Sequence, residues 1–329
     1  MRRALSALAR TVLTVCLVCL LAGLLPAPDA RAQKGEVESV TIQLSWKHQF
    51  QFAGYYAALE QGYYRQAGLD VTLVEADATH DPITEVSEGR AQYGVAGPEL
   101  TVAYAQHKPV VILMPIFQHS PIVLITSAAA GAKGIPGLAG ATLAIEPGGV
   151  LILDYLEQEG LKLSSIHMAP HTYDTEALRA GRIQGMSAYL TDEPFELTRD
   201  GFAFATFSPL SVGCDFYGDT LFASHNEFDN HPDRVTRMKQ ATVRGWAWAL
   251  EHPEQVVDLI LARYTQRHDR EHLLYEARMT KRLIDANSTP LGDVDPARWR
   301  RMAKVFAGRG LIPADLDLSG LLPPDAKAK

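Results

Sequence analysis

The sequence has few cysteines and none of the common catalytic signatures. Three cysteines occur in 329 residues, and two of them, Cys16 and Cys19, lie within the first twenty positions. Cys214 alone is left in the body of the chain, so no internal disulfide can form there, and a lone cysteine is a poor basis for a zinc site. The chain after residue 32 contains no G-x-S-x-G, Walker A or C-x-x-C pattern, which makes an enzyme a weaker expectation.

Long apolar runs are also absent after the first 32 residues, which have the pattern of a secretory signal peptide. Arg2, Arg3 and Arg10 introduce an uncharged apolar run at 11–25, and a small-x-small cleavage pattern ends at Ala32. The run is shorter than the roughly 20 residues that a membrane span needs. We therefore expect cleavage near Ala32 and export to the periplasm, with a retained membrane anchor as the alternative.

Basic residues are outnumbered by acidic residues in the remaining chain. Removing residues 1–32 takes away four arginines and one aspartate and changes the formal net charge from −7 to −10. An acidic surface disfavours nucleic acid and anionic lipid as partners.

The body of the chain alternates short apolar runs with helical patterns, which predicts βαβ units on mostly parallel sheets. A Gly-rich joint at 131–140 separates two such series. The predicted strands are 40–44, 71–74, 93–96 and 110–116 in the first series, and 142–145, 165–168, 185–188 and 202–207 in the second. The predicted helices between them are 54–61, 82–88, 98–106, 147–157 and 175–180.

The last third of the chain is predicted to be almost entirely helical. Val235, Met238, Thr242, Trp246 and Ala249 follow the i, i+3, i+4 spacing of one buried helix face. Further helices are expected at 254–264, 270–285 and 296–308, with Pro253 ending one helix and starting the next.

These patterns predict an α/β protein with two lobes joined by a two-stranded hinge and a helical C-terminal tail. The expected organisation is a first lobe at 33–122 and 220–329 and a second lobe at 123–219, with crossings near 120–128 and 208–221. Ligands of open α/β sheets bind outside the carboxyl ends of the strands, so we expect a cleft there.

Two kinds of side chain follow the predicted strands. Aromatic and amide residues fill 46–56, where they either line a pocket or plug the core. The acids at 192–193 either contact a ligand or start a helix, and the segment 213–219 is a hinge, a pocket wall or both. His268 and His272 are four apart but lack the glutamate and third ligand of a helical zinc motif, so they are interpreted as surface residues.

Several of these segments resemble the NMT1/THI5-like family of periplasmic binding proteins. The resemblance covers about residues 40–310 and is carried by QLSW at 43–46, FAGYYA at 52–57, GYYRQAGLDV at 62–71, GVAG at 94–97, IFQHSP at 116–121, LAGAT at 138–142, TDEPF at 191–195, DFYGD at 215–219 and HPDRV at 231–235. The resemblance implies a type II periplasmic binding protein fold and delivery of a small molecule to an ABC transporter permease in the membrane.

The resemblance also implies a ligand class. Members bind thiamine-precursor pyrimidines, riboflavin or sulfonates, and the aromatic and amide-rich first loop is most similar to the pyrimidine-precursor branch. Because Asp192, Glu193, Asp215 and Asp219 are expected at the cleft, we predict a neutral or cationic planar heterocycle with amino groups. The predicted ligand contacts are Trp46, Phe50, Tyr55, Gly97, Glu99, Phe117, Gln118, Gly149, Tyr189, Asp192, Glu193, Asp215 and Tyr217.

The family's pyrimidine synthase carries a lysine after the third strand and a cysteine-rich run near the return crossing. This chain has Gly97-Pro98 and Gly213-Cys214-Asp215-Phe216 at those places, so catalytic residues, cofactor and metal are not expected. We expect a monomer. The alternative roles are a sensor component that presents its ligand to a membrane receptor, and a binding protein for riboflavin or a sulfonate.

Overall fold

The computed structural model describes residues 37–77, 79–147, 149–285 and 288–324. The predicted leader at 1–32 and its cleavage site lie outside the described residues. Within the described ranges, no helix combines the length and the apolar character needed to cross a membrane.

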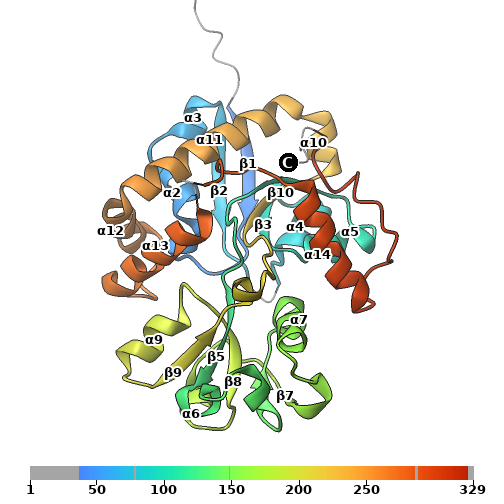
Figure 1. Cartoon of the computed structure of the whole chain (residues 1–329). Helices are drawn as coiled ribbons and strands as arrows, with labels where there is room; N and C mark the ends of the chain where they lie inside the picture. Colours follow the sequence, from blue (N-terminus) through green and yellow to red (C-terminus); the bar gives the residue numbers. More distant parts are fainter. Residues whose placement is uncertain (1–36, 78, 148, 286–287, 325–329) are drawn as a thin grey trace, which may run out of the picture. The chain divides into compact units, whose positions relative to one another are not determined.

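The first of two sheets has five strands in the order β2-β1-β3-β10-β4 (Figure 1). Strand β10 is antiparallel to both of its neighbours, and the others run parallel to one another. Every residue of β4 is buried, as expected for a strand covered on both faces. The strands are β1 (Glu38–Gln43), β2 (Leu69–Val74), β3 (Tyr93–Ala96), β4 (Val110–Pro115) and β10 (Thr220–Ser224).

Short helices connect these strands. Helix α4 shows why they begin where they do: the Asp81 side chain accepts a hydrogen bond from the Thr84 amide, and Pro82 occupies the first helical turn. The connecting elements are η1 (Phe50–Phe52), α2 (Ala53–Glu60), α3 (Tyr63–Gln66), α4 (Pro82–Ser87), α5 (Leu100–Ala105) and α10 (His225–Asn230).

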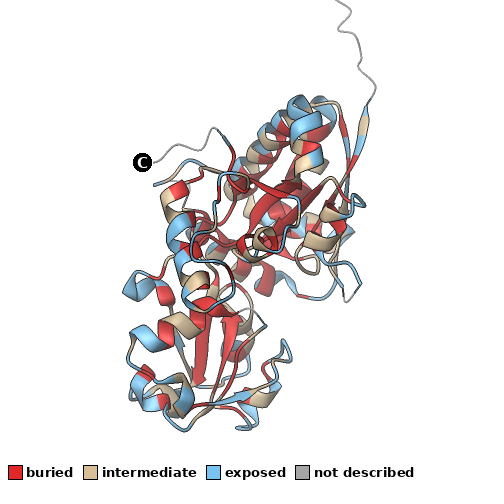
Figure 2. Ribbon diagram, turned by 90° about the vertical axis from the view of Figure 1, so that its right-hand side faces the viewer, coloured by how far each residue is buried: buried red, intermediate tan, exposed pale blue. Residues whose placement is uncertain are grey.

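The second sheet also has five strands, in the order β7-β6-β8-β5-β9, with β5 antiparallel to both neighbours. Its strands are β5 (Ile122–Ser127), β6 (Thr142–Ala144), β7 (His167–Ala169), β8 (Gly185–Tyr189) and β9 (Phe204–Phe207). Its other elements are α6 (Ala128–Gly131), η2 (Ile135–Leu138), α7 (Val150–Gln158), η3 (Leu163–Ser165), α8 (Glu176–Arg179), α9 (Glu193–Arg199) and η4 (Pro209–Val212). Both sheets are buried along their central strands (Figure 2).

The helical C-terminal region is confirmed, with helix ends within about a residue of those predicted. The helices are α11 (Pro232–Glu251), α12 (Pro253–Arg263), α13 (Arg270–Ile284) and α14 (Pro296–Gly308). All five residues predicted to form the inner face of α11 are buried. The predicted α/β alternation is also confirmed, although several elements are shorter than expected; the helix expected at 147–157, for example, begins at Val150.

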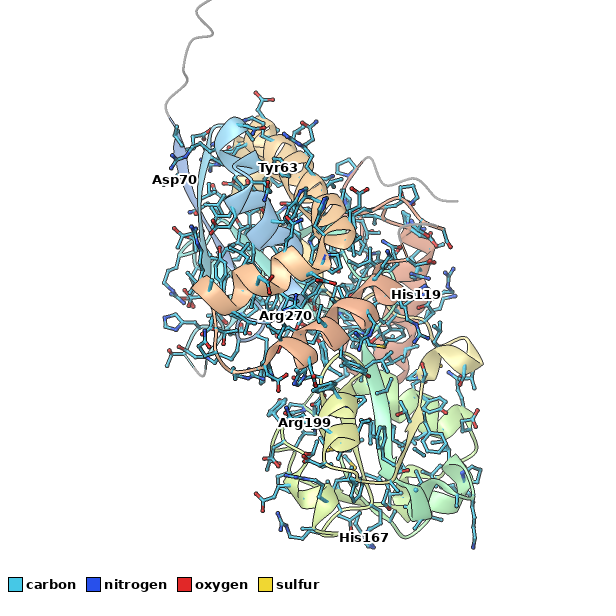
Figure 3. All side chains as sticks on the ribbon, turned by 90° about the vertical axis from the view of Figure 1, so that its left-hand side faces the viewer. Tyr63, Asp70, His119, His167, Arg199 and Arg270 are labelled. Atoms are coloured by element: carbon cyan, nitrogen blue, oxygen red, sulfur yellow. The ribbon has the colours of Figure 1, made fainter. Side chains whose placement is uncertain are left out.

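Two crossover segments, residues 116–121 and 208–219, carry the chain from the first sheet to the second and back. They are hydrogen-bonded to each other: the Ile116 amide donates to the Asp219 carbonyl at 2.7 Å, and the Gly218 amide donates to the Phe117 carbonyl at 3.0 Å. His119, labelled in Figure 3, lies on the first of them. The crossing expected near 120–128 was placed too late, because Ile122–Ser127 is already an antiparallel strand of the second sheet. The crossing expected at 208–221 ran two residues too far, because strand Thr220–Ser224 begins at 220.

Candidate ligand-binding cleft

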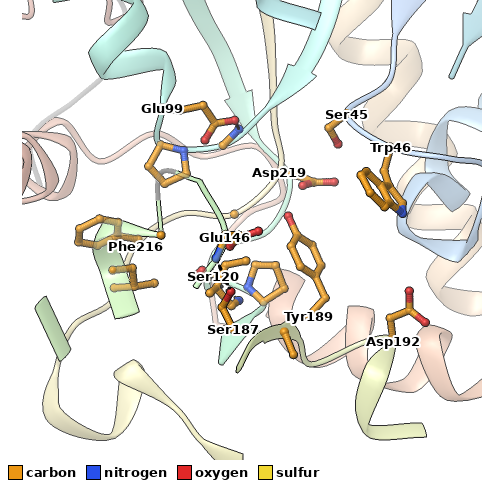
Figure 4. Close-up of a pocket in the computed structure, with 18 of the residues that line it drawn as sticks. Ser45, Trp46, Glu99, Ser120, Glu146, Ser187, Tyr189, Asp192, Phe216 and Asp219 are labelled. Carbon is orange, nitrogen blue, oxygen red and sulfur yellow. Dashed lines mark hydrogen bonds between the residues drawn. The ribbon is translucent and has the colours of Figure 1, made fainter. Parts of the chain in front are cut away.

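A cavity of about 360 Å³ is lined by residues from both sheets and both crossover segments (Figure 4). Its volume is in the range of pockets that bind small molecules and cofactors. The lining follows the rule for open α/β sheets, because Trp46 comes after β1, Glu99 after β3, Glu146 after β6 and Tyr189 at the end of β8. The carboxyl ends of strands from two sheets therefore meet around one space.

Eight of the thirteen predicted contacts line this cavity. They are Trp46, Gly97, Glu99, Gly149, Tyr189, Asp192, Glu193 and Tyr217. Asp219, predicted as one of four acids at the cleft, also lines it.

Three predicted aromatic contacts belong instead to the hydrophobic core. Phe50, Tyr55 and Phe117 are at most 1% exposed. The rings of Tyr55 and Phe117 contact Trp246 of α11 edge-on, at centroid distances of 5.9 and 6.3 Å. The core interpretation of these aromatics is therefore the right one, and stacking of a ligand between Trp46 and Tyr55 is ruled out by this placement.

Gln118 and Asp215 also lie away from the cavity lining. The Gln118 amide donates to the carbonyl of Asp293 at 3.3 Å. Asp215 forms ion pairs with Arg298 of α14 and, at 2.9 Å, with His119. Asp215 thus ties the return crossover to its neighbours, and the proposal that it contacts the ligand is withdrawn.

Glu146 and Tyr173 are lining residues that the prediction missed. Glu146 directly follows the predicted strand 142–145, so the strand-end rule would have found it. Tyr173 lies in the loop after β7, where the sequence carries no comparable signal. Its ring lies 5.4 Å from that of Trp46, with 44° between the planes. A ligand ring stacked between two side-chain rings needs about 7 Å between those rings. Trp46 and Tyr173 are too close for that, so together they form one aromatic wall of the cavity.

Carboxyl groups dominate the polar lining. Desolvation raises the pKa of Glu146 to about 7, that of Asp219 to about 7 and that of Glu193 to about 8. It also raises the pKa of Glu99, which is accessible from the cavity yet surrounded by protein atoms. Like charge contributes, since Glu99 disfavours ionisation of Glu146 and Asp219, and Asp192 disfavours that of Glu193.

The carboxyls differ in how firmly the protein holds them. Asp219 accepts a hydrogen bond from the Gln51 amide at 2.7 Å, and Glu99 accepts one from the Gly97 amide at 2.7 Å. Glu193 accepts one from the Tyr189 amide at 2.8 Å. The Glu146 carboxyl has no hydrogen-bond or ion-pair partner among the described residues. Glu146 is therefore the carboxyl that is most available to a ligand.

These shifts predict a pH-dependent stability for the unliganded protein. A carboxyl whose pKa is higher in the folded chain holds protons that the unfolded chain has released, so its contribution is present at low pH and is lost as the pH rises through 7–8. We expect the Tm to fall by about 3 °C or more between pH 6.5 and pH 8.5. His268, whose buried ring has a pKa lowered to about 4, titrates mainly below this window.

Calorimetry across that pH range measures the dependence. Asp219→Asn keeps an oxygen for Gln51 and removes the titrating proton, so its Tm should vary less with pH. A parent protein that is more stable at pH 8.5, or a variant with an unchanged pH profile, contradicts this electrostatic picture.

Two mixed sheets connected by paired crossovers, with a cleft at their strand ends and a helical C-terminal region, define a type II periplasmic binding protein fold. The chain belongs to the NMT1/THI5-like family, whose pattern matches residues 49–256. The predicted fold class and family are thus confirmed.

Curated relatives carry binding-protein names. The riboflavin-binding protein RibY of Chloroflexus aurantiacus is 24% identical over 317 residues, covering 89% of this chain and 86% of that protein. The formylaminopyrimidine-binding protein of Halalkalibacterium halodurans is 23% identical over 233 residues, covering 68% and 70%. Among solved structures, the periplasmic aliphatic sulphonate binding protein SsuA of Escherichia coli has a TM-score of 0.68 at 16% identity, covering 85% of this chain and 96% of that one.

Proposed function

We propose that this protein is the exported solute-binding component of an ABC importer and that it binds a planar, amino-bearing nitrogen heterocycle of the aminopyrimidine class without chemical conversion. Export with cleavage near Ala32, a monomeric state and handover to a membrane permease are parts of the same proposal. The family, the fold and the binding-protein names of the relatives support the general role.

The observation that supports the ligand class is the carboxyl-rich lining, in which the Glu146 carboxyl has no partner among the described residues. Among the described residues of the lining, Arg267 is the one arginine or lysine, and it already lies 3.7 Å from Asp192. A sulfonate would find no unpaired arginine or lysine among the described lining residues, and it would meet like charge in a desolvated site wherever the lining carboxyls are ionised. An amino group facing an ionised carboxylate instead gains a charge-assisted hydrogen bond.

An aminopyrimidine also suits the protonation behaviour of Glu146. Such a ring presents an amino donor next to a ring-nitrogen acceptor. A carboxyl group accepts from the amino group with one oxygen and, when protonated, donates to the ring nitrogen with the other. Because the Glu146 pKa is about 7, both protonation states are accessible near neutral pH. The Tyr189 hydroxyl and the Trp46 ring lie near it in the cavity (Figure 4), and Tyr173 extends the aromatic wall beside Trp46.

The cavity volume favours a flavin as the second candidate. About 360 Å³ corresponds to roughly a dozen waters at about 30 Å³ each, which is more than a single pyrimidine ring fills. Riboflavin would place its fused rings against the aromatic wall, and its ribityl hydroxyls would donate to the carboxyls.

The deciding experiment starts with mass spectrometry of small molecules released from freshly purified protein. Calorimetric titration with an aminopyrimidine, riboflavin and an alkanesulfonate then ranks the three classes. We expect one aminopyrimidine per chain, recovered unchanged after long incubation. Tightest binding of riboflavin selects the second candidate. Preference for the sulfonate, or catalytic product formation, rejects the proposal.

A further inference from the structure

Four potential metal-binding side chains gather beside the cleft, where α9 of the second sheet packs against α13. Asp192 precedes α9 and Glu196 lies one turn into it, while His268 precedes α13 and His272 lies in its first turn. The interpretation of both histidines as surface residues is wrong, because His268 is 8% exposed and His272 is 1% exposed. A search for ligand spacing along one helix cannot find this cluster, because its two pairs lie on different segments. The packing of α9 against α13 brings Asp192 and Glu196 next to His268 and His272.

The two helices are held together by direct contacts. The Phe195 ring lies 4.6 Å from the ring of His272 and 5.4 Å from that of Tyr275. The Tyr275 hydroxyl donates to the Leu190 carbonyl at 3.0 Å. Arg199, labelled with Arg270 in Figure 3, forms an ion pair with Asp269 at 3.1 Å. The four side chains therefore converge from both sheets in one packed interface.

The atoms that face each other are not satisfied by the protein. His272 Nε2 and Asp192 Oδ1 are 2.8 Å apart, yet both are buried without a hydrogen-bond partner among the described residues, as is His268 Nε2. Two polar atoms this close without hydrogen-bond geometry are arranged like neighbouring ligands of a shared ion. Burying a polar atom without a partner costs free energy. Three such atoms side by side therefore indicate that a bound group satisfies them.

The cluster also has the spacing and charge of a metal site. Its four ligand atoms all lie within 4.8 Å of one another, and ligands of tetrahedral zinc, at bond lengths of 2.0–2.2 Å, are separated by about 3.4 Å. Small side-chain rotations cover the difference. Two neutral imidazoles and two carboxylates carry a charge of −2, which a divalent ion balances.

The neighbouring charges leave the ligand atoms free. Arg267 approaches Asp192 through Oδ2, at 3.7 Å, and not through Oδ1. Buried Glu276 accepts a hydrogen bond from the Phe50 amide with Oε2, while its Oε1 lies 3.7 Å from His272 Nε2.

We propose that Asp192, Glu196, His268 and His272 form a binding site for a divalent transition metal of the zinc type, which links α9 to α13 and so joins the two sheets next to the cleft. Mixed imidazole and carboxylate ligands suit zinc and its neighbours better than magnesium or calcium. Because the α9 segment supplies two of the four ligands and the α13 segment supplies the other two, the complete site exists only while α9 and α13 are in contact. Metal binding therefore favours the arrangement in which α9 and α13 are in contact.

Titration of the tag-free, chelator-treated protein with Zn²⁺ and Co²⁺ tests the site. We expect one equivalent of each, a rise in Tm with Zn²⁺, and the strong visible absorption of four-coordinate Co²⁺. His268→Gln and Glu196→Gln should each weaken Zn²⁺ binding at least about tenfold. Glu196 is only half-buried, so its variant should fold even where a histidine variant does not.

His167→Gln is the matched control, because His167 is an exposed histidine of the second sheet and its loss should leave metal binding unchanged. Absence of stoichiometric binding to the parent protein overturns the proposal. So does Zn²⁺ binding of parental affinity in a folded His268→Gln or Glu196→Gln variant. These readouts use the metal alone, so they are independent of which organic ligand the cleft binds.

Discussion

Glu146→Ala is expected to weaken binding of an aminopyrimidine by about tenfold to a hundredfold. The Glu146 carboxyl lines the cavity with no partner among the described residues, so the substitution breaks no internal contact. What is lost is a hydrogen bond between a charged group and the ligand, which contributes about 1.5–3 kcal/mol. Calorimetric titration of parent and variant at pH 7 measures the change.

Glu146→Gln separates charge from hydrogen bonding. Glutamine can still accept from the amino group and donate to the ring nitrogen, so its affinity should fall between those of the parent and the alanine variant. Glu176→Ala is the matched control, since Glu176 lies on the same sheet's surface with 71% of its side chain exposed. Binding within twofold of the parent by Glu146→Ala would remove this residue from the ligand site. A gain in sulfonate affinity there would show that charge selects the ligand.

Strand ends were the part of the site that the sequence could locate. Trp46, Glu99, Tyr189 and Asp192 each follow an apolar run whose length and flanking residues indicate a strand, and the parallel arrangement brings such ends to one edge. The same rule applied to Glu146 would have succeeded. The crossing segments were harder to delimit, because β5 is a short apolar run that lies antiparallel between β8 and β9.

Residues with distant partners could not be assigned from local pattern. Whether Tyr55 faces a cleft or the core depends on Trp246, which lies almost two hundred positions later and occupies the space beside it. Asp215 is acidic and sits in a crossover, but Arg298 of α14 draws it away from the cavity. His272 and Asp192 belong to segments that contact only after folding. A sequence pattern gives the chemistry of such residues and leaves their partners open.

Gly245→Ala is expected to destabilise the protein by about 3 kcal/mol, at the upper end of the usual cost of overpacking, because α2 and α11 cross in backbone contact at this glycine. An added Cβ would lie 2.2 Å from the Gly54 carbonyl oxygen and 2.6 Å from the Ala58 Cβ. Neither neighbour is a flexible side chain that can move aside, so the two helices must separate, and the clash outweighs the helix-propensity gain of roughly 1 kcal/mol. Such a loss corresponds to a fall in Tm of roughly 6 °C or more.

Gly308→Ala is the control for that substitution, since Gly308 ends α14 and an added Cβ there meets nothing within 4 Å. This variant should keep or slightly raise the Tm. The difference in Tm between the two alanine variants therefore measures the clash at the helix crossing separately from helix propensity. Urea unfolding of both variants measures the free-energy changes directly. If Gly245→Ala unfolds at the parental urea concentration, α2 and α11 are not in backbone contact at this position. At the same crossing, Trp246 packs against Tyr55 and Phe117. The destabilised variant should therefore lose order first in this part of the core, beneath the first crossover segment.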